Sequence, residues 1–178
     1  NQMPELKISN AMYRNNGDLS FTNTTAEWGM DMPSYSNGAA YGDLDNDGDL
    51  DLVVNNIDDE AFIYENRSVR GDASDKRYLQ VAFEGEGRNT FGVGAKVLVY
   101  DSGKVQLQEV FPTRGFQSSV DYVMTFGITS NRIDSLVVVW SGGACQRMTD
   151  VKVNQKITLR EKDASQRYSY ALHHRRAP

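Results

Sequence analysis

The sequence predicts an all-β protein, and three observations support this fold class. First, Gly and Asn recur at short intervals, in pairs such as Asn37-Gly38 and Gly142-Gly143, and these residues adopt the positive φ values that tight turns require. Second, short runs rich in Val, Ile, Tyr and Phe lie between the turns, as in Leu136–Trp140, and this composition is typical of strands. Third, no stretch has the apolar spacing of a long amphipathic helix.

Strand-like segments follow one another in the C-terminal half of the chain. Apolar residues alternate in Tyr78–Phe83, which predicts a strand with one buried face. Lys96–Tyr100 and Lys104–Phe111 flank the turn sequence Asp-Ser-Gly and predict a hairpin. Further strands are predicted at Gly115–Phe126, Ile133–Trp140 and Val151–Leu159.

Charge divides the chain into two regions. No Lys or Arg occurs between Arg14 and Arg67, and this interval holds twelve acidic residues, so that it carries a charge of −12. The rest of the chain, with 19 basic and 12 acidic residues, carries +7. A polar stretch at 69–76 marks the transition. We therefore expect one domain at 1–70 and a second at 76–161, followed by a tail at 162–178 that is either disordered or the start of a further element.

Composition excludes several classes of function. The net charge of −5, without a basic stripe, argues against nucleic-acid binding, because such affinity comes mainly from Lys and Arg. No apolar run approaches the ~20 residues that span a bilayer, so we expect no transmembrane segment. A single cysteine, Cys145, excludes an internal disulfide and a Cys-based zinc site. Serine catalysis is not expected, because the two histidines, His173 and His174, lie in the tail.

The most informative segment alternates Asp with other residues. Its five carboxylates belong to Asp43, Asp45, Asp47, Asp49 and Asp51. Such closely spaced charges repel one another unless a cation or water screens them. The first three stand at positions 1, 3 and 5 of a loop, and Gly48 at position 6 permits a sharp turn. Hard oxygen ligands in a flexible loop suit Ca²⁺, with Mg²⁺ as second choice. A solvated acidic turn would not require this strict alternation.

The way the loop ends distinguishes it from an EF-hand. An EF-hand needs a bidentate Glu at position 12, where this chain has Val54, and a helix on each side. Here a strand is predicted to begin after Leu50, so that Asp51 at position 9 is the natural closing ligand. We expect Asp49 at position 7 to contribute its backbone carbonyl while its side chain faces outward.

Residues 13–66 resemble one FG-GAP/VCBS-type repeat, the blade unit of integrin-like β-propellers. The matching segments are Asn15–Phe21, Gly42–Val54 and Ile63–Asn66. The resemblance implies a propeller-blade-like unit whose loop binds Ca²⁺ through Asp43, Asp45, Asp47 and Asp51 and the position-7 carbonyl. Propellers need several blades, and this chain has one. We therefore expect it to be the C-terminal part of a larger repeat protein, packed against further repeats or against its neighbouring domain.

The second region resembles the ASPIC/UnbV domain, which characteristically follows such repeats. The resemblance covers about Lys76–Glu161 and is carried by Asn89–Val97, Arg114–Ser119, Phe126–Ile128 and Leu136–Gly143. Ser141 departs from the family, which usually has Pro after the Trp. The resemblance implies an antiparallel β-sandwich. Because the family includes animal cartilage acidic proteins and bacterial secreted or cell-surface proteins, it also implies an extracellular, periplasmic or cell-surface location.

Taken together, these features predict a non-catalytic extracellular calcium-binding module that binds a protein or glycan partner and uses Ca²⁺ as a structural ion. The alternative is an accessory domain of a metal-dependent or carbohydrate-active enzyme, in which the ion acts as a Lewis acid. Aromatic side chains that would either stack on a glycan or fill the core are Trp28, Tyr35, Tyr41 and Trp140.

Three short motifs add candidate recognition and modification sites. Arg70-Gly71-Asp72 spells an integrin-recognition tripeptide, although a solvated linker explains it as well. Glycosylation sequons begin at Asn23 and Asn66.

Overall fold

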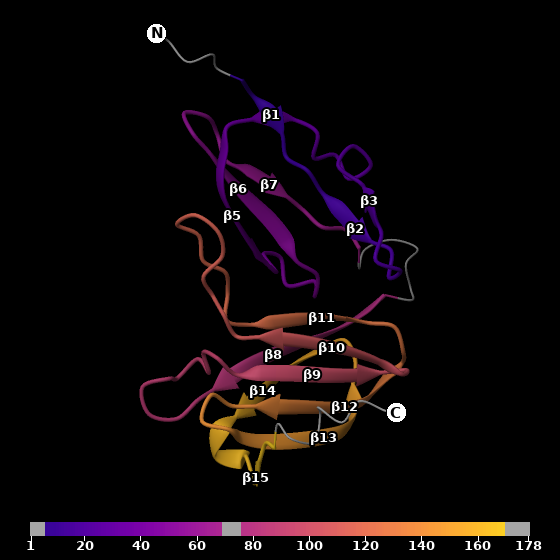
Figure 1. The fold of residues 1–178 in the computed structure, drawn as a ribbon, viewed down its shortest axis with the longest axis vertical. Coiled ribbons are helices and arrows are strands. Elements are labelled where there is room, and N and C mark those ends of the chain that lie inside the picture. Colours follow the sequence, from indigo (N-terminus) through magenta and orange to yellow (C-terminus); the bar gives the residue numbers. More distant parts are fainter. Residues whose placement is uncertain (1–5, 69–75, 170–178) are drawn as a thin grey trace.

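The computed structural model describes residues 6–68 and 76–169, which form two parts (Figure 1). The N-terminal part, here called the repeat, contains β1 (Ile8–Ser9), β2 (Tyr13–Asn15), β3 (Phe21–Asn23), β4 (Pro33–Ser34), β5 (Ser36–Gly42), β6 (Asp51–Asn56) and β7 (Phe62–Tyr64). The C-terminal part, here called the sandwich, contains β8 (Arg77–Glu84), β9 (Lys96–Asp101), β10 (Lys104–Glu109), β11 (Met124–Ile128), β12 (Arg132–Val139), β13 (Ala144–Lys152), β14 (Gln155–Arg160), the 3-10 helix η1 (Glu161–Asp163) and β15 (Gln166–Arg167). The described residues contain no α-helix, which confirms the all-β prediction.

The repeat consists of small antiparallel sheets with little core of their own. β2 pairs with β3, β1 pairs with β4, and β5, β6 and β7 form a three-stranded sheet in chain order. In the described part of the repeat, the buried apolar side chains are Met30 and Val54. A unit that buries so few apolar side chains gains little stability from its own packing.

The sandwich has a continuous hydrophobic core between two sheets. One sheet has the strand order β10-β9-β12-β13-β15, and the other has the order β11-β8-β14. The core draws side chains from both sheets: Leu79, Val81, Val97, Val99, Phe126, Ile133, Leu136, Val138 and Leu159. Alternation in β8, which has Leu79 and Val81 in the core, agrees with the predicted pattern.

One strand pair differs from an antiparallel sandwich. β14 runs parallel to β8, with Gln155 opposite Leu79 and Arg160 opposite Glu84. The other pairs between the strands of the sandwich are antiparallel. The chain passes from one sheet to the other in the turn between β13 and β14. As a result, β14 pairs with β8 and not with β13, the strand that precedes it in the chain.

Two predicted strand segments differ from the structure because residues with positive φ interrupt them. Residues 115–123 form a loop that turns at Gly115 and Gln117, with φ of 59° and 46°, and β11 begins only at Met124. The predicted strand Val151–Leu159 is divided between β13 and β14 by Asn154, whose φ is 56°. The Asn154 amide donates to the Tyr78 carbonyl at 2.7 Å and so secures the turn to β8.

Ordered structure continues into the predicted tail at 162–178. η1 follows β14 directly, and β15 pairs with β13 through Ala144↔Arg167 and Cys145↔Gln166. The Tyr168 amide then donates to the Gly143 carbonyl at 2.9 Å. The remaining tail residues, 170–178, lie outside the described residues.

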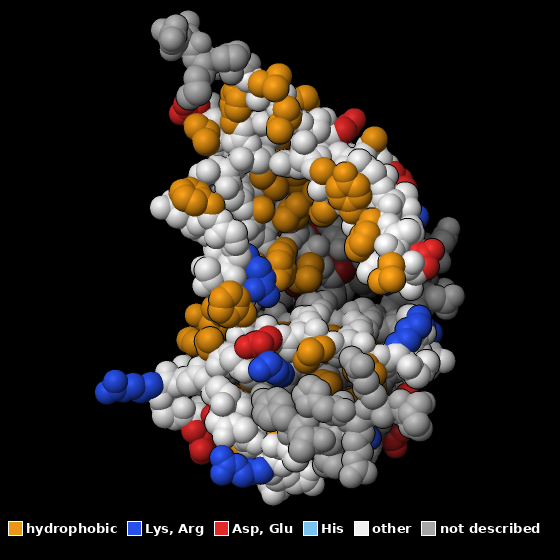
Figure 2. Space-filling view, viewed as in Figure 1, with side chains coloured by type: hydrophobic (Ala, Val, Ile, Leu, Met, Phe, Trp, Pro, Cys, Tyr) orange, Lys and Arg blue, Asp and Glu red, His pale blue; other side chains and the backbone are white. Residues whose placement is uncertain are grey.

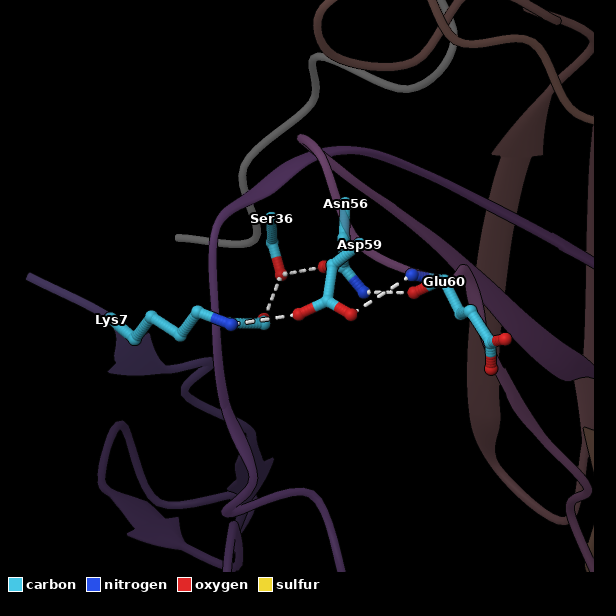
Figure 3. Close-up of polar contacts among 6 residues, drawn as sticks. Lys7, Ser36, Asn56, Asp59 and Glu60 are labelled. Carbon is cyan, nitrogen blue, oxygen red and sulfur yellow. Dashed lines mark hydrogen bonds and ion pairs between the residues drawn. The ribbon is translucent and has the colours of Figure 1, made fainter. Parts of the chain in front are cut away.

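A polar network at the end of the repeat that is remote from the sandwich connects Lys7, directly before β1, to the β6–β7 turn (Figure 3). Lys7 Nζ contacts Asp59 Oδ2 at 2.8 Å, and Asp59 Oδ1 accepts the Glu60 amide at 3.1 Å. Asn56 Nδ2 donates to the Glu60 carbonyl at 2.7 Å, and Ser36 Oγ donates to Asn56 Oδ1 at 3.1 Å. The hydrogen bond and charge of Lys7, together with the Glu60 amide, lower the pKa of Asp59.

Candidate metal centre

The aspartate loop connects β5 to β6 and turns at two residues with positive φ. Asn46 has φ of 61° and Gly48 has φ of 99°. An Asn tolerates the left-handed region, whereas a φ near that of Gly48 favours glycine. These two positions reverse the chain, so that Gly42 at the end of β5 pairs with Asp51 at the start of β6. The predicted role of Gly48 as the turn residue agrees with this geometry.

Three of the five predicted aspartates converge. Carboxylate oxygens of Asp43, Asp45 and Asp51 all lie within 4.8 Å of one another. Asp45 is exposed, Asp43 is half-buried, and Asp51 is 3% exposed. The convergent group does not include Asp47 or Asp49. The strand-to-strand connection therefore brings together positions 1, 3 and 9, which include the predicted closing ligand.

Backbone amides of the loop orient these carboxylates. Asp43 Oδ1 accepts the Asp47 amide and Asp43 Oδ2 accepts the Gly48 amide, both at 3.1 Å. Asp51 Oδ2 accepts the Leu44 amide at 2.9 Å, and Asp51 Oδ1 accepts the Asn66 amide at 2.8 Å. Each of these hydrogen bonds satisfies a backbone N–H donor that would otherwise be left unpaired. A carboxylate has about four lone-pair sites, so oxygens held in this way still have room to bind a cation.

Asp49 corrects the expectation that its side chain faces outward. The residue is only 6% exposed, and its Oδ2 accepts a hydrogen bond from Ser68 Oγ at 3.1 Å. Asn66 lies beside it and donates from Nδ2 to the Leu50 carbonyl at 3.2 Å. The side chain of Asp49 therefore fastens the segment after β7 to the loop. A glycan on the Nδ2 of Asn66 would compete with this packing, whereas the other sequon asparagine, Asn23, is exposed.

The chemistry of the donor set fits a hard divalent cation. The convergent atoms are all carboxylate oxygens, and residues 43–51 include no basic side chain. Ca²⁺ prefers such ligands and accepts the irregular geometry of a flexible loop, whereas Zn²⁺ sites usually draw on His or Cys. The three convergent carboxylates therefore fit a hard divalent cation.

The loop lies directly against strand β8 of the sandwich. Gln80 Nε2 donates to Asp43 Oδ2 at 2.6 Å. The ring of Tyr78 lies so close to Gly48 that a Cβ there would be 2.1 Å from Tyr78 Cε1. A further contact between the two parts joins Arg114 Nε to Tyr41 Oη at 3.1 Å. The sequence reasoning missed Gln80 and Tyr78, because their only signal was an outward position on an alternating strand.

The other candidate residues lie in the core, on the surface or outside the described residues. Trp140 is 2% exposed and packs edge-to-face on Phe83, with ring centroids 5.9 Å apart. It is a core residue and cannot share a glycan platform with Trp28, which is 47% exposed. Cys145 is buried, as a structural cysteine should be. Arg70-Gly71-Asp72 and the two histidines lie outside the described residues.

Comparison with family models finds two matches that occur in the predicted order. Residues 9–54 match the FG-GAP-like repeat, and residues 85–166 match the ASPIC and UnbV domain. The chain carries an FG-GAP-like repeat followed by an ASPIC/UnbV domain. No curated protein matches the chain.

The FG-GAP match contains the aspartate loop, and the ASPIC/UnbV match contains most of the sandwich. FG-GAP repeats are typical of extracellular proteins, so the combination is a β-rich module of extracellular type. Among the described residues, no helix has the length and apolar character needed to cross a membrane.

Proposed function

We propose that this FG-GAP–ASPIC/UnbV chain is a non-catalytic, calcium-binding interaction module of an extracellular, periplasmic or cell-surface protein. The observation that carries the proposal is the convergence of Asp43, Asp45 and Asp51 within 4.8 Å. Three carboxylates at this separation repel one another, and a divalent cation bound between them attracts all three and outweighs that repulsion. The role proposed for Ca²⁺ is to stabilise the loop and the strands on either side of it.

The residues that would hold the ion are those three aspartates, joined by Asp47 and by the backbone carbonyl of Asp49. Asp47 Oδ1 accepts the Asp49 amide at 3.1 Å, which draws position 5 toward position 7. The bound ion would supply positive charge to a region of the chain that has no Lys or Arg between Arg14 and Arg67. It would thereby compensate for the small apolar core of the repeat.

A structural role is favoured over catalysis by the way the carboxylates are used. Backbone amides from the loop and from Asn66 hold both oxygens of Asp43 and both oxygens of Asp51, and Asp51 is nearly inaccessible. A metal that activates a substrate needs an open ligand position. Buried, amide-bound carboxylates are better suited to fixing a turn.

The proposed partners are further repeats of a longer protein, and a protein or glycan ligand. Apolar side chains of the repeat gather around a hollow on one face (Figure 2). A cavity of about 530 Å³ between the repeat and the loop before β11 is lined by Met12, Met30, Ala39, Leu52 and Phe116, among others. Exposed apolar surface of this kind is typical of interaction sites.

Thermal unfolding with and without calcium tests the proposed function. EDTA is expected to lower the melting temperature, and excess Ca²⁺ to restore it. An ion at 100 times its Kd adds about 2.7 kcal/mol to the free energy of unfolding. Asp45→Ala and Asp51→Ala should abolish the response. If the wild-type melting curve is the same in EDTA and in Ca²⁺, and calorimetry detects no binding, the proposal is wrong.

A further inference from the structure

Gln80 is a buried polar side chain on the outer face of the sandwich. Its neighbours in β8, Leu79 and Val81, point into the core, so Gln80 points away from it, toward the repeat. Outer sheet faces are usually solvated, yet Gln80 is only 8% exposed. The residues opposite it in the adjacent strands are Thr125 in β11 and Lys156 in β14. The aspartate loop covers this position.

The Gln80 amide has a specific partner in the loop. Nε2 donates to Asp43 Oδ2 at 2.6 Å, and the Gly48 amide donates to the same oxygen at 3.1 Å. Two donors fill the capacity of one carboxylate oxygen. Within the described part of the chain, Asp43 Oδ1 accepts only the Asp47 amide, at 3.1 Å, and so keeps one lone pair. The contact from the sandwich thus determines which oxygen of Asp43 is available to a cation.

We propose that Gln80 is a positioning residue of the cation site, so that Ca²⁺ binding in the repeat and docking of the ASPIC/UnbV domain are linked. The inference rests on the proposed calcium site and adds a residue from the other domain to it. Gln80 holds Oδ2 of Asp43 and directs Oδ1 to the ion. Because linkage is reciprocal, an ion that binds more tightly to the docked arrangement also strengthens the docking.

The surroundings of Gln80 restrict the movement of the Asp43 side chain. Tyr78, on the same face of β8, covers Gly48, so the turn of the loop and the carboxylate of Asp43 both rest on one strand. The cavity left between loop and sheet is only about 70 Å³ and is lined by Asp43, Gln80, Thr125 and Lys156, among others. In so small a space, Asp43 cannot turn without losing the Gln80 hydrogen bond.

Gln80→Met tests the link, because it keeps the length of the side chain and removes the donor. The matched control is Gln106→Met, since Gln106 Nε2 donates to the Gly127 carbonyl at 2.7 Å within the sandwich. Loss of a group that orients a metal ligand weakens metal binding by about 10-fold or more. Calorimetric titration with CaCl₂ should therefore give that increase in Kd for Gln80→Met and no change for Gln106→Met. A wild-type Kd for Gln80→Met overturns the inference, whereas absent binding to the wild-type chain overturns the proposed function itself.

A second measurement uses the unmodified chain and does not depend on whether the variant folds. The side-chain amide signals of Gln80, in a ¹⁵N-labelled sample, should shift on CaCl₂ titration with the same Kd as the backbone signals of the loop. The signals of Gln106 should stay in place. Loop signals that shift while those of Gln80 do not would show that the sandwich takes no part in binding the ion.

Discussion

The ring of Tyr78 occupies the space where a side chain at Gly48 would have to be. A Cβ on Gly48 would lie 2.1 Å from Tyr78 Cε1 and 2.3 Å from Tyr78 Cζ. Gly48 therefore serves two purposes: its φ of 99° makes the turn of the aspartate loop, and its missing side chain lets the loop approach β8. The residue that shapes the candidate calcium site is therefore also one of the residues at which the two domains touch.

Gly48→Ala should destabilise the loop and weaken calcium binding. The substitution places a Cβ in a conformation that costs about 1–3 kcal/mol for residues other than glycine, and it pushes the Tyr78 ring away. We expect a lower melting temperature and a higher Kd for Ca²⁺. Gly42→Ala is the control, because Gly42 is not at positive φ and a Cβ there meets nothing within 4 Å. Equal melting temperatures for the two variants would contradict this account.

Asn substitutions at Asp45 and Asp51 should separate ligand loss from structural damage. Asp45 is exposed, so Asp45→Asn should remove the calcium response and change the stability measured in EDTA by no more than about 0.5 kcal/mol. Asp51 accepts the Leu44 and Asn66 amides, and its replacement leaves one of these donors facing an NH₂ group. Asp51→Asn should therefore also cost about 1–3 kcal/mol in EDTA. Urea unfolding in EDTA measures both values. Identical losses would show that burial of Asp51 is unimportant.

The fold was predictable where one local pattern decided the structure. Alternation in Tyr78–Phe83 and the Asp-Ser-Gly turn between β9 and β10 are local signals, and both match the structure. The parallel pairing of β14 with β8 is not a local property, because it depends on Asn154 turning the chain toward Tyr78. Nothing in the apolar pattern of Val151–Leu159 distinguishes one long strand from two strands in different sheets.

The candidate site shows the same division between local and tertiary information. The spacing predicted a common centre for Asp43, Asp45, Asp47 and Asp51, and the structure brings three of these together, namely Asp43, Asp45 and Asp51. A strand–loop–strand connection fixes those three positions relative to one another. The inward side chain of Asp49 depends on Ser68, which lies beyond β7. The contact with Gln80 depends on how the two domains pack. Residues that lie far apart in the sequence carry these interactions, so spacing alone could not reveal them.

Asp101 should give the sandwich an acid-sensitive stability. Burial acts to raise the pKa of Asp101, but hydrogen bonds from Ser130 and from the amide and hydroxyl of Thr129 outweigh it and lower the pKa. A depressed pKa in the folded state stabilises the fold above the unfolded value of about 3.9. That contribution is lost as the pH falls through the lower, folded value.

Asp101→Asn should therefore cost about 1.5–3 kcal/mol at pH 7, because hydrogen bonds to a charged group are lost. The difference from wild type should shrink as the pH is lowered below about 3.9. Asp150→Asn is the control, since Asp150 is exposed and its pair with Arg132 contributes only about 0–1 kcal/mol. Urea unfolding at a series of pH values measures both variants, and a difference for Asp101→Asn that is independent of pH would refute the assignment.

The two tryptophans provide a matched test of the sandwich core. Trp140 packs edge-to-face on Phe83 and is 2% exposed, whereas Trp28 lies on the repeat and is 47% exposed. Gly92 packs directly against Phe83 and Trp140, because a Cβ on Gly92 would be 2.9 Å from Phe83 Cβ and 3.1 Å from Trp140 Cζ3. Such tight packing leaves little freedom to collapse, so Trp140→Ala should cost about 3–5 kcal/mol. Trp28→Ala should cost well under half as much, because its ring is already partly in water. Comparable losses of unfolding free energy for the two variants would contradict the burial of Trp140 and the exposure of Trp28.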